Sequence, residues 1–359
     1  EILIGTMQDD IISSLSGDDF IYANLGDDII ILSGSGTQYY DGQEGNDTLE
    51  IHPQIWMTTA ENYVGAVDLS TNFVGTHTDR DNPLSDTVIN VENITLLGDI
   101  NFVMNGDNND NIIITEGGND ELYGGGGNDT LKSGAGDDFV YGEEGNDTII
   151  QNGSGTQLFD GGEGVDTYLL DLENWPITFA DDFIGEVNLT ANFSGFHLDY
   201  NHPLNDTVLN VENITLNGDY DFIMRGDDKN NLINTDGGDD RLYGGGGNDV
   251  LNPGWGNDFV YGDEGDDVLV LTGSGTQHFD GGDGIDTFEI YLPNYNSGSI
   301  GLIDLNIGFA GDPDDIDNPL SDTLENIENV KIITLGGYII KGDETNNILT
   351  GGSGNDTLS

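Results

Sequence analysis

A repeat of nine residues dominates this chain. Between Gly106 and Ile150 the sequence divides without a gap into five repeats: GDNNDNIII, TEGGNDELY, GGGGNDTLK, SGAGDDFVY and GEEGNDTII. Most repeats have a glycine-rich first half, an aspartate in the sixth place and an aliphatic residue in the eighth. Because strand side chains alternate between two faces, the second half predicts a very short strand, and the glycines predict a tight turn. One such repeat cannot bury its apolar residue alone, so the repeats must stack into a solenoid.

The repeats are grouped into arrays that recur about every 120 residues, with starts at Gly106, Gly226 and Gly342. A truncated array comes first, from Gly5 to Glu50. The predicted organisation is arrays at 1–50, 106–169, 226–289 and 342–359, separated by segments at 51–105, 170–225 and 290–341. Since the chain begins without Met inside one array and ends inside another, we expect it to be a piece of a longer protein.

Charge and composition exclude several classes of protein. The chain has 68 acidic and 7 basic residues and a net charge of −61, which excludes a phosphate-binding surface for nucleic acid and opposes anionic membranes. No apolar run approaches the ~18 residues of a membrane-spanning helix. Cysteine is absent, which excludes thiolate metal sites. Only His77 and His197 recur, in two of the three copies, so we expect no histidine metal site and expect any stabilising metal to be bound by oxygen. Low hydrophobicity with charge of one sign predicts disorder unless a cation neutralises the acids.

The eighth residues of the repeats form the predicted core. A strand and a turn every nine residues would wind a solenoid whose two thin parallel sheets share one row of aliphatic side chains. These include Ile12, Ile21, Ile30, Leu49, Ile113, Leu122, Leu131, Val140, Ile149, Leu242, Leu251, Val260, Leu269 and Leu358. Each buried aliphatic side chain contributes roughly 1.5–3 kcal/mol, whereas ordering the backbone costs about 1–2 kcal/mol per residue. The turns must therefore add stability.

We expect the sixth-place aspartates to provide the stability that the turns must add. Turns of successive coils would lie about 4.8 Å apart, so their carboxylates form rows in which like charges repel. A divalent cation between two turns reverses that repulsion and binds turn carbonyls that lack partners. Oxygen-only ligands and a flexible shell favour Ca²⁺ over Mg²⁺. Solvated acidic turns without metal are the alternative, since Asp, Asn and Gly favour turns by themselves.

The repeats GGGGNDTLK (124–132), GGGGNDVLN (244–252) and GGSGNDTLS (351–359) resemble the hemolysin-type calcium-binding, or RTX, nonapeptide. The resemblance implies an all-β fold, a calcium-stabilised parallel β-roll, with roughly ten calcium ions bound by sixth-place aspartates and turn carbonyls. It also implies export by a type I secretion system and folding outside the cell. The residues to which the resemblance assigns calcium binding are Asp10, Asp19, Asp28, Asp47, Asp120, Asp129, Asp138, Asp147, Asp166, Asp240, Asp249, Asp258, Asp267, Asp286 and Asp356.

Some repeats depart from the pattern. The opening repeats of three arrays have an amide in the sixth place, where we expect a weakened or empty site: Asn111, Asn231 and Asn347. The GSGTQ repeats have glutamine there, and we expect them to bind no ion of their own: Gln38, Gln157 and Gln277. One extra residue precedes each GSGTQ repeat and predicts a local bulge: Leu32, Gln151 and Leu271.

The segments between arrays predict further strands that continue the solenoid. They share alternating stretches such as VGAVDLSTNF and IGEVNLTANF, and the related NPLSDTVINVENI and HPLNDTVLNVENI. An aromatic residue follows each array and is interpreted as a cap on the core or as a sugar-stacking platform: Trp56, Trp175 and Tyr295. Outward-facing pairs recur and are either a ladder for a partner or covered by the inserted segments: Phe20/Tyr22, Phe139/Tyr141 and Phe259/Tyr261.

These features favour a structural role over catalysis. No serine elbow, zincin helix or phosphate loop occurs, so we expect no enzyme activity in this chain. The expected function is a calcium-binding structural or adhesive segment of a secreted bacterial surface protein, folded at extracellular calcium concentrations. Expected partners are other copies, in a sheet or filament, or a cell-surface or glycan ligand. The alternative is the C-terminal secretion and folding module of a type I secreted exoenzyme whose catalytic domain lies outside this chain.

Overall fold

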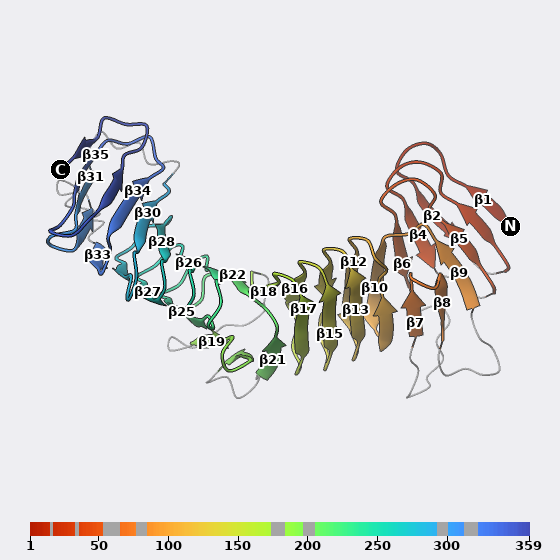
Figure 1. Cartoon of the computed structure of the whole chain (residues 1–359). Coiled ribbons are helices and arrows are strands. Elements are labelled where there is room, and N and C mark those ends of the chain that lie inside the picture. Colours follow the sequence, from red (N-terminus) through yellow and green to blue (C-terminus); the bar gives the residue numbers. More distant parts are fainter. Residues whose placement is uncertain are drawn as a thin grey trace. The chain divides into compact units, whose positions relative to one another are not determined.

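A computed structural model of the chain describes residues 1–14, 17–32, 36–52, 65–76, 85–173, 184–196, 205–292, 301–311 and 322–359. These residues form strands and turns and contain no helix, and the strands wind into a parallel β-roll (Figure 1). The expected all-β fold is therefore confirmed. The chain divides into two compact units, Glu1–Leu169 with Leu204–Val211, and Leu170–Pro203 with Glu212–Ser359.

Each unit contains two sheets, here called A and B, whose strands alternate along the chain. In the first unit, sheet A contains β1 (Ile2–Ile4), β3 (Phe20–Tyr22), β5 (Tyr39–Asp41), β7 (Gly65–Asp68), β8 (Phe73–Thr76), β9 (Ser85–Ile89), β11 (Phe102–Asn105), β13 (Glu121–Gly126), β15 (Phe139–Glu144), β17 (Leu158–Glu163) and β21 (Asn205–Leu209). Sheet B contains β2 (Ile11–Ser14), β4 (Ile29–Leu32), β6 (Thr48–Ile51), β10 (Asn93–Asp99), β12 (Ile112–Gly117), β14 (Thr130–Lys132), β16 (Thr148–Gln151) and, at the boundary of the units, β18 (Thr167–Asp171).

The second unit repeats this arrangement. Its sheet A contains β19 (Gly185–Asn188), β20 (Phe193–Phe196), β23 (Phe222–Arg225), β25 (Arg241–Gly246), β27 (Phe259–Glu264), β29 (His278–Asp280), β31 (Gly301–Asp304), β32 (Phe309–Gly311), β33 (Asp322–Glu325), β35 (Tyr338–Lys341) and β37 (Thr357–Leu358). Its sheet B contains β22 (Asn213–Asn217), β24 (Leu232–Asn234), β26 (Val250–Asn252), β28 (Val268–Leu271), β30 (Thr287–Ile290), β34 (Asn329–Ile332) and β36 (Ile348–Thr350).

Two nonapeptides make one coil, so neighbouring strands of a sheet are 18 residues apart in the arrays. In sheet B, Ile113 pairs with Leu131, and Leu131 pairs with Ile149. In sheet A, Leu122 pairs with Val140 by the same offset. This register stacks identical repeat positions directly above one another, as the nine-residue period requires.

The core lies between the sheets and consists of the eighth residues of the repeats. Those within the stack are 0 % exposed, as predicted: Ile21, Ile30, Leu49, Ile113, Leu122, Leu131, Val140, Ile149, Leu242, Leu251, Val260 and Leu269. The prediction is wrong at the ends, where Ile12 is half-buried and Leu358 is 48 % exposed, because a terminal coil is covered on one side only. Aromatic side chains contact each other in the core in two places, Phe159 with Tyr168 and Phe279 with Phe288.

Glycine is required in the turns because successive coils approach closely there. Gly145 has φ +142°, and a Cβ atom at this position would lie 1.5 Å from the carbonyl oxygen of Gly127 in the preceding coil. Any side chain would push the coils apart as well as strain the backbone.

The described parts of the segments between arrays continue the roll. In the first unit, β9 pairs with β5, and β10 pairs with both β6 and β12, so these strands complete a coil without the glycine-rich repeat. In sheet A, β8 pairs antiparallel with β7 on one side and with β9 on the other. The same arrangement recurs in the second unit through β31, β32 and β33. Trp56, Trp175 and Tyr295, interpreted as caps, lie outside the described residues.

The extra residues shift the register against the preceding coil by one, as the predicted bulge requires. Leu269 pairs with Leu251, 18 residues earlier, whereas a Cβ atom on Gly273 would lie 1.9 Å from the carbonyl oxygen of Gly254, 19 residues earlier. Strand β4 pairs with β6 continuously from Ile29 through Leu32, and β28 pairs with β30 continuously through Leu271. The extra side chain is buried in each case, so it lengthens the strand by one inward-facing residue. Burial of an apolar side chain explains why the roll accommodates the insertion.

The recurrent phenylalanines on the outer face are not covered. Phe20, Phe139 and Phe259 are 47 %, 46 % and 42 % exposed, so the interpretation that the pairs are covered is wrong for the phenylalanines. The tyrosines of the same pairs, Tyr22, Tyr141 and Tyr261, are half-buried. Tyrosines beside them stack along sheet A, with ring centroids 5.0 Å apart in Tyr123–Tyr141 and again in Tyr243–Tyr261. Within the described residues, no helix is long and apolar enough to cross a membrane.

Candidate calcium centres

The predicted ligands lie in two rows of turns. Each of these aspartates is the residue immediately before a strand. Row A leads into sheet A and contains Asp19, Asp120, Asp138, Asp240, Asp258 and Asp356. Row B leads into sheet B and contains Asp10, Asp28, Asp47, Asp129, Asp147, Asp166, Asp249, Asp267 and Asp286. Within each unit the structure therefore brings together the aspartates of every second repeat, because one coil consists of two repeats.

One carboxylate oxygen of each of these aspartates except Asp10 accepts a hydrogen bond from the preceding coil. The backbone N–H of Asn111 donates to Oδ1 of Asp129 at 2.7 Å, and the N–H of Asp129 donates to Oδ1 of Asp147 at the same distance. In row A the N–H of Asp120 donates to Oδ1 of Asp138 at 2.9 Å. These bonds hold the carboxylates in a fixed orientation inside the turns.

The second oxygen has no such partner in seven aspartates of row B. There Oδ2 is buried and accepts no hydrogen bond in Asp28, Asp47, Asp129, Asp147, Asp249, Asp267 and Asp286. Leaving a buried, charged acceptor unsatisfied is costly, and native structures rarely do so. Repetition of the same unsatisfied atom along a row points to a ligand common to all of these turns.

Other oxygens face the same space. A Cβ atom placed on Gly142 would lie 2.3 Å from Oδ2 of Asp147 and 2.3 Å from the carbonyl oxygen of Gly161 in the following coil. A Cβ on Gly262 would meet Oδ2 of Asp267 and the carbonyl oxygen of Gly281 in the same way. Carboxylate and carbonyl oxygens from adjacent coils thus converge beside a glycine. These donors fit a hard cation that takes a flexible shell of oxygen ligands, which describes Ca²⁺.

Burial disfavours the charged form of these aspartates. Burial raises the pKa of Asp129, Asp258 and Asp267 to about 7, and that of Asp240 to about 8. Neighbouring aspartates raise the pKa further, as Asp147 does for Asp129. Keeping these groups charged near neutral pH is therefore unfavourable until positive charge is supplied.

In the repeats with an amide in the sixth place, a side-chain N–H group donates a hydrogen bond to a carbonyl oxygen of another turn. In the GSGTQ repeats, Nε2 of Gln157 donates to the carbonyl oxygen of Gly136 at 2.8 Å, and Nε2 of Gln277 donates to Gly256 at 3.0 Å. In an opening repeat, Nδ2 of Asn111 donates to the carbonyl oxygen of Glu92 at 2.7 Å. These turns use hydrogen bonds where their neighbours offer oxygens to a cation. The expectation that they bind no ion or bind it weakly stays a prediction.

Sequence reasoning missed acidic residues that continue both rows through the inserted segments. Row A is continued by Asp86, Asp206 and Asp322, which are buried and accept an N–H bond at Oδ1 from Gln38, Gln157 and Gln277, respectively. Burial raises the pKa of Asp206 and Asp322 to about 7. The available signal was the Asp-Thr pair of LSDTV and LNDTV, which matches NDTL of the nonapeptide.

Row B is continued by glutamates. Oε2 of Glu92 accepts the N–H of Asp47 at 2.8 Å, and Oε2 of Glu328 accepts the N–H of Asp286 at the same distance. These residues belong to the shared Val-Glu-Asn and Ile-Glu-Asn elements. The longer side chain reaches back to the preceding coil without the glycine-rich turn.

The ends of the rows are less enclosed. Asp10 and Asp356 are half-buried, since each lies in a terminal coil. Oδ1 of Asp19 accepts a hydrogen bond from the amino group of Glu1 at 2.8 Å. The structure therefore places the predicted ligands together but encloses those of the interior coils best.

A comparison with protein families identifies these repeats. The RTX calcium-binding nonapeptide repeat matches residues 4–35, 105–140, 114–149, 223–251, 235–269 and 339–359. The matches fall on the arrays that contain rows A and B. A comparison with curated proteins finds no significant match.

Proposed function

We propose that this chain, whose arrays are RTX calcium-binding nonapeptide repeats, is a structural segment of a secreted bacterial surface protein that folds when it meets extracellular calcium. The observation that carries the proposal is the buried, unpartnered Oδ2 atom repeated along row B. A chain of net charge −61 can order such carboxylates only when cations neutralise them.

The two carboxylate oxygens of each aspartate have different roles in the proposed calcium site. The N–H groups of one coil orient the aspartates of the next through Oδ1, which leaves Oδ2 directed at the glycine carbonyls of the adjacent turn. Rows A and B would hold the ions, about ten in total. Bound Ca²⁺ would supply positive charge and coordination positions for oxygens of two coils at once. Binding free energy then becomes folding free energy, because the site does not exist in the unfolded chain.

Low calcium has the opposite effect. Without cations the acids repel, and the narrow core of one aliphatic residue per repeat is too small to hold the roll. The chain would remain unfolded and exportable inside the cell. Extracellular calcium-binding modules typically have Kd values of about 10⁻⁴–10⁻³ M, so millimolar calcium outside the cell would complete folding.

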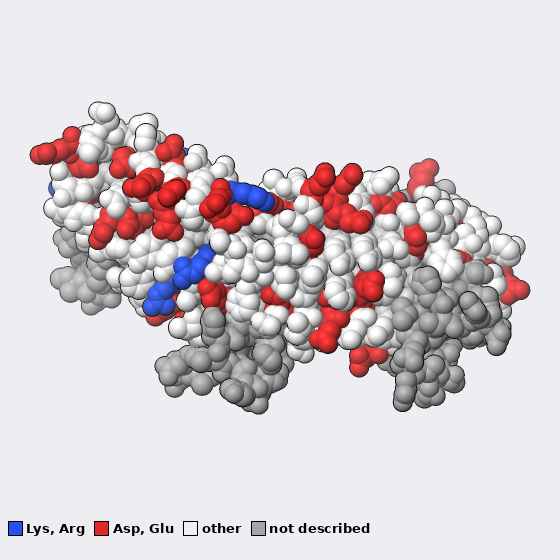
Figure 2. Space-filling view, turned by 60° about the horizontal axis from the view of Figure 1, so that its bottom comes forward, with Lys and Arg blue, Asp and Glu red and all other residues white. Residues whose placement is uncertain are grey.

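The structural role includes no catalysis in this chain. A roll with exposed phenylalanines at a fixed interval and stacked tyrosines beside them offers a regular outer face for adhesion or for assembly with other copies. Acidic side chains dominate the charged surface visible in Figure 2, so calcium could also bridge such faces between molecules.

Circular dichroism of the full chain tests the proposal. In excess chelator we expect the spectrum of an unfolded chain, and addition of millimolar CaCl₂ should restore the strand signal, whereas MgCl₂ at the same concentration should not. A strand signal that is unchanged by chelator would overturn the proposal. Sedimentation with and without calcium would measure assembly separately.

A further inference from the structure

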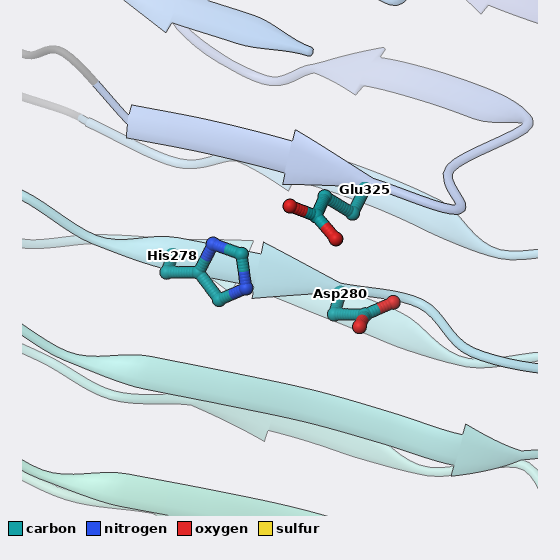
Figure 3. Close-up of side chains that lie close together, drawn as sticks. All are labelled: His278, Asp280 and Glu325. Atoms are coloured by element: carbon teal, nitrogen blue, oxygen red, sulfur yellow. The ribbon is translucent and has the colours of Figure 1, made fainter.

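A cluster of metal-ligating side chains lies on the outer face of sheet A, away from rows A and B. His278 and Asp280 are on β29, and Glu325 is on the adjacent strand β33 (Figure 3). His278 and Asp280 are two residues apart and share a face of the strand, and Asp280 pairs directly with Glu325. One potential ligand atom from each residue lies within 4.8 Å of the others.

Two hydrogen bonds orient this cluster. Nδ1 of His278 contacts Oγ1 of Thr323 at 2.6 Å, which leaves Nε2 for a ligand, and Figure 3 shows that this side of the ring faces Asp280 and Glu325. Nδ2 of Asn326 donates to Oδ1 of Asp280 at 2.7 Å, so Oδ2 of Asp280 stays available. Metal-binding histidines commonly have their second ring nitrogen fixed in this manner.

We propose that His278, Asp280 and Glu325 form a binding site for a transition-metal ion of the zinc type, distinct from the calcium centres in the turns. An imidazole nitrogen with two carboxylates suits Zn²⁺ and related ions, whereas Ca²⁺ takes oxygen ligands. Ligand atoms around a tetrahedral zinc ion lie about 3.4 Å apart, whereas these atoms lie within 4.8 Å of one another, so the exposed Glu325 side chain must rotate toward His278 and Asp280 to close the site. Three protein ligands leave the fourth position for water or for a group from another molecule.

The repeats of the chain supply an internal comparison. The coil equivalent to β29 and β33 has Leu158, Asp160 and Leu209 in the preceding copy, joined by the same register. There Asn210 donates to Oδ1 of Asp160 at 2.7 Å, as Asn326 does to Asp280. The amide-held aspartate is therefore common to both coils and belongs to the fold. His278 and Glu325 are what the later coil adds, and the leucines at their positions show that the roll folds without them.

Calorimetric titration of the full chain with ZnCl₂ in saturating calcium tests the site. We expect one zinc ion to bind the wild-type chain with measurable heat, and H278L and E325L, which install the leucines of the preceding copy, to lose that heat. T323V should weaken binding by about 10–100-fold, because it removes the bond that orients the imidazole. Circular dichroism in calcium should show all variants folded.

A reciprocal variant makes the test independent of loss of function. L158H combined with L209E builds the same three ligands around Asp160 and should raise the zinc stoichiometry by one. Equal zinc binding by wild type and H278L would place the zinc elsewhere and overturn the proposal, as would the absence of specific zinc binding to the wild-type chain.

Discussion

Replacement of Asp129 by asparagine separates the two roles of a sixth-place aspartate. D129N keeps an oxygen that can accept the N–H of Asn111, now 2.7 Å from Oδ1, but removes the charge and the oxygen assigned to calcium. Asn111 itself shows that the roll accommodates an amide in this place. We therefore expect D129N to stabilise the calcium-free roll and to weaken the calcium-bound one.

The structure gives the size of the first effect. Burial raises the pKa of Asp129 from its ordinary value of 3.8 to about 7. A folded-state pKa above the unfolded one means that the penalty is absent below pH 4, grows between pH 4 and 7 and is complete above pH 7. The difference of about three pH units corresponds to about 4 kcal/mol, so at pH 8 D129N should remove up to about that much destabilisation from the calcium-free roll.

The assay is a calcium titration followed by circular dichroism at pH 8, together with the number of ions bound at saturation. D129N should show more strand signal than wild type in the absence of calcium and should bind one ion fewer than wild type at saturation. The matched control is D110N, which removes the same charge from the exposed neighbour whose Oδ1 accepts the N–H of Asn128. If D110N and D129N have equal effects, or if D129N binds as much calcium as wild type, the reasoning fails.

Three further predictions follow from the turns. G145A should lower the melting temperature in calcium and expose the array to protease, because its Cβ would lie 1.5 Å from the Gly127 carbonyl oxygen. The control G126A, whose Cβ would meet nothing closer than 3.6 Å, should leave the melting temperature and the protease resistance unchanged. Q277D should add a bound calcium ion and destabilise the calcium-free roll, because it replaces the N–H group that donates to the Gly256 carbonyl oxygen with a carboxylate oxygen. An unchanged number of bound calcium ions would contradict this. In chelator, lowering the pH from 8 to 5 should increase the strand signal, since acids with pKa values of about 6–8 in the roll take up protons; a decrease would show that burial does not oppose their charge.

The fold could be predicted because the period of nine specifies turn, strand and inward-facing residue in every repeat. Ile113, Leu131 and Ile149 are paired in one column because they share a repeat position. The same logic located the sixth-place aspartates in the turns. Where the nine-residue period is interrupted, the extra residue also lengthens the strand, since a buried Leu32 or Leu271 adds to the core.

The contacts that could not be predicted depend on the pairing of strands that lie far apart in the sequence. Asp206 accepts the N–H of Gln157 although 49 residues separate them, and no local period links the two. His278 and Glu325 meet because β29 pairs with β33 across an inserted segment. Such contacts depend on the position at which the inserted segment rejoins the sheet. The nine-residue spacing does not specify that position.

Anomalous diffraction from crystals grown in calcium would test most directly whether cations satisfy the buried carboxylates. The predicted difference map has peaks between successive turns along rows A and B, each within about 2.3–2.6 Å of an aspartate Oδ2 and of glycine carbonyl oxygens, with none beside Gln157 or Gln277. A folded roll whose aspartate turns contain no anomalous peaks would contradict the account.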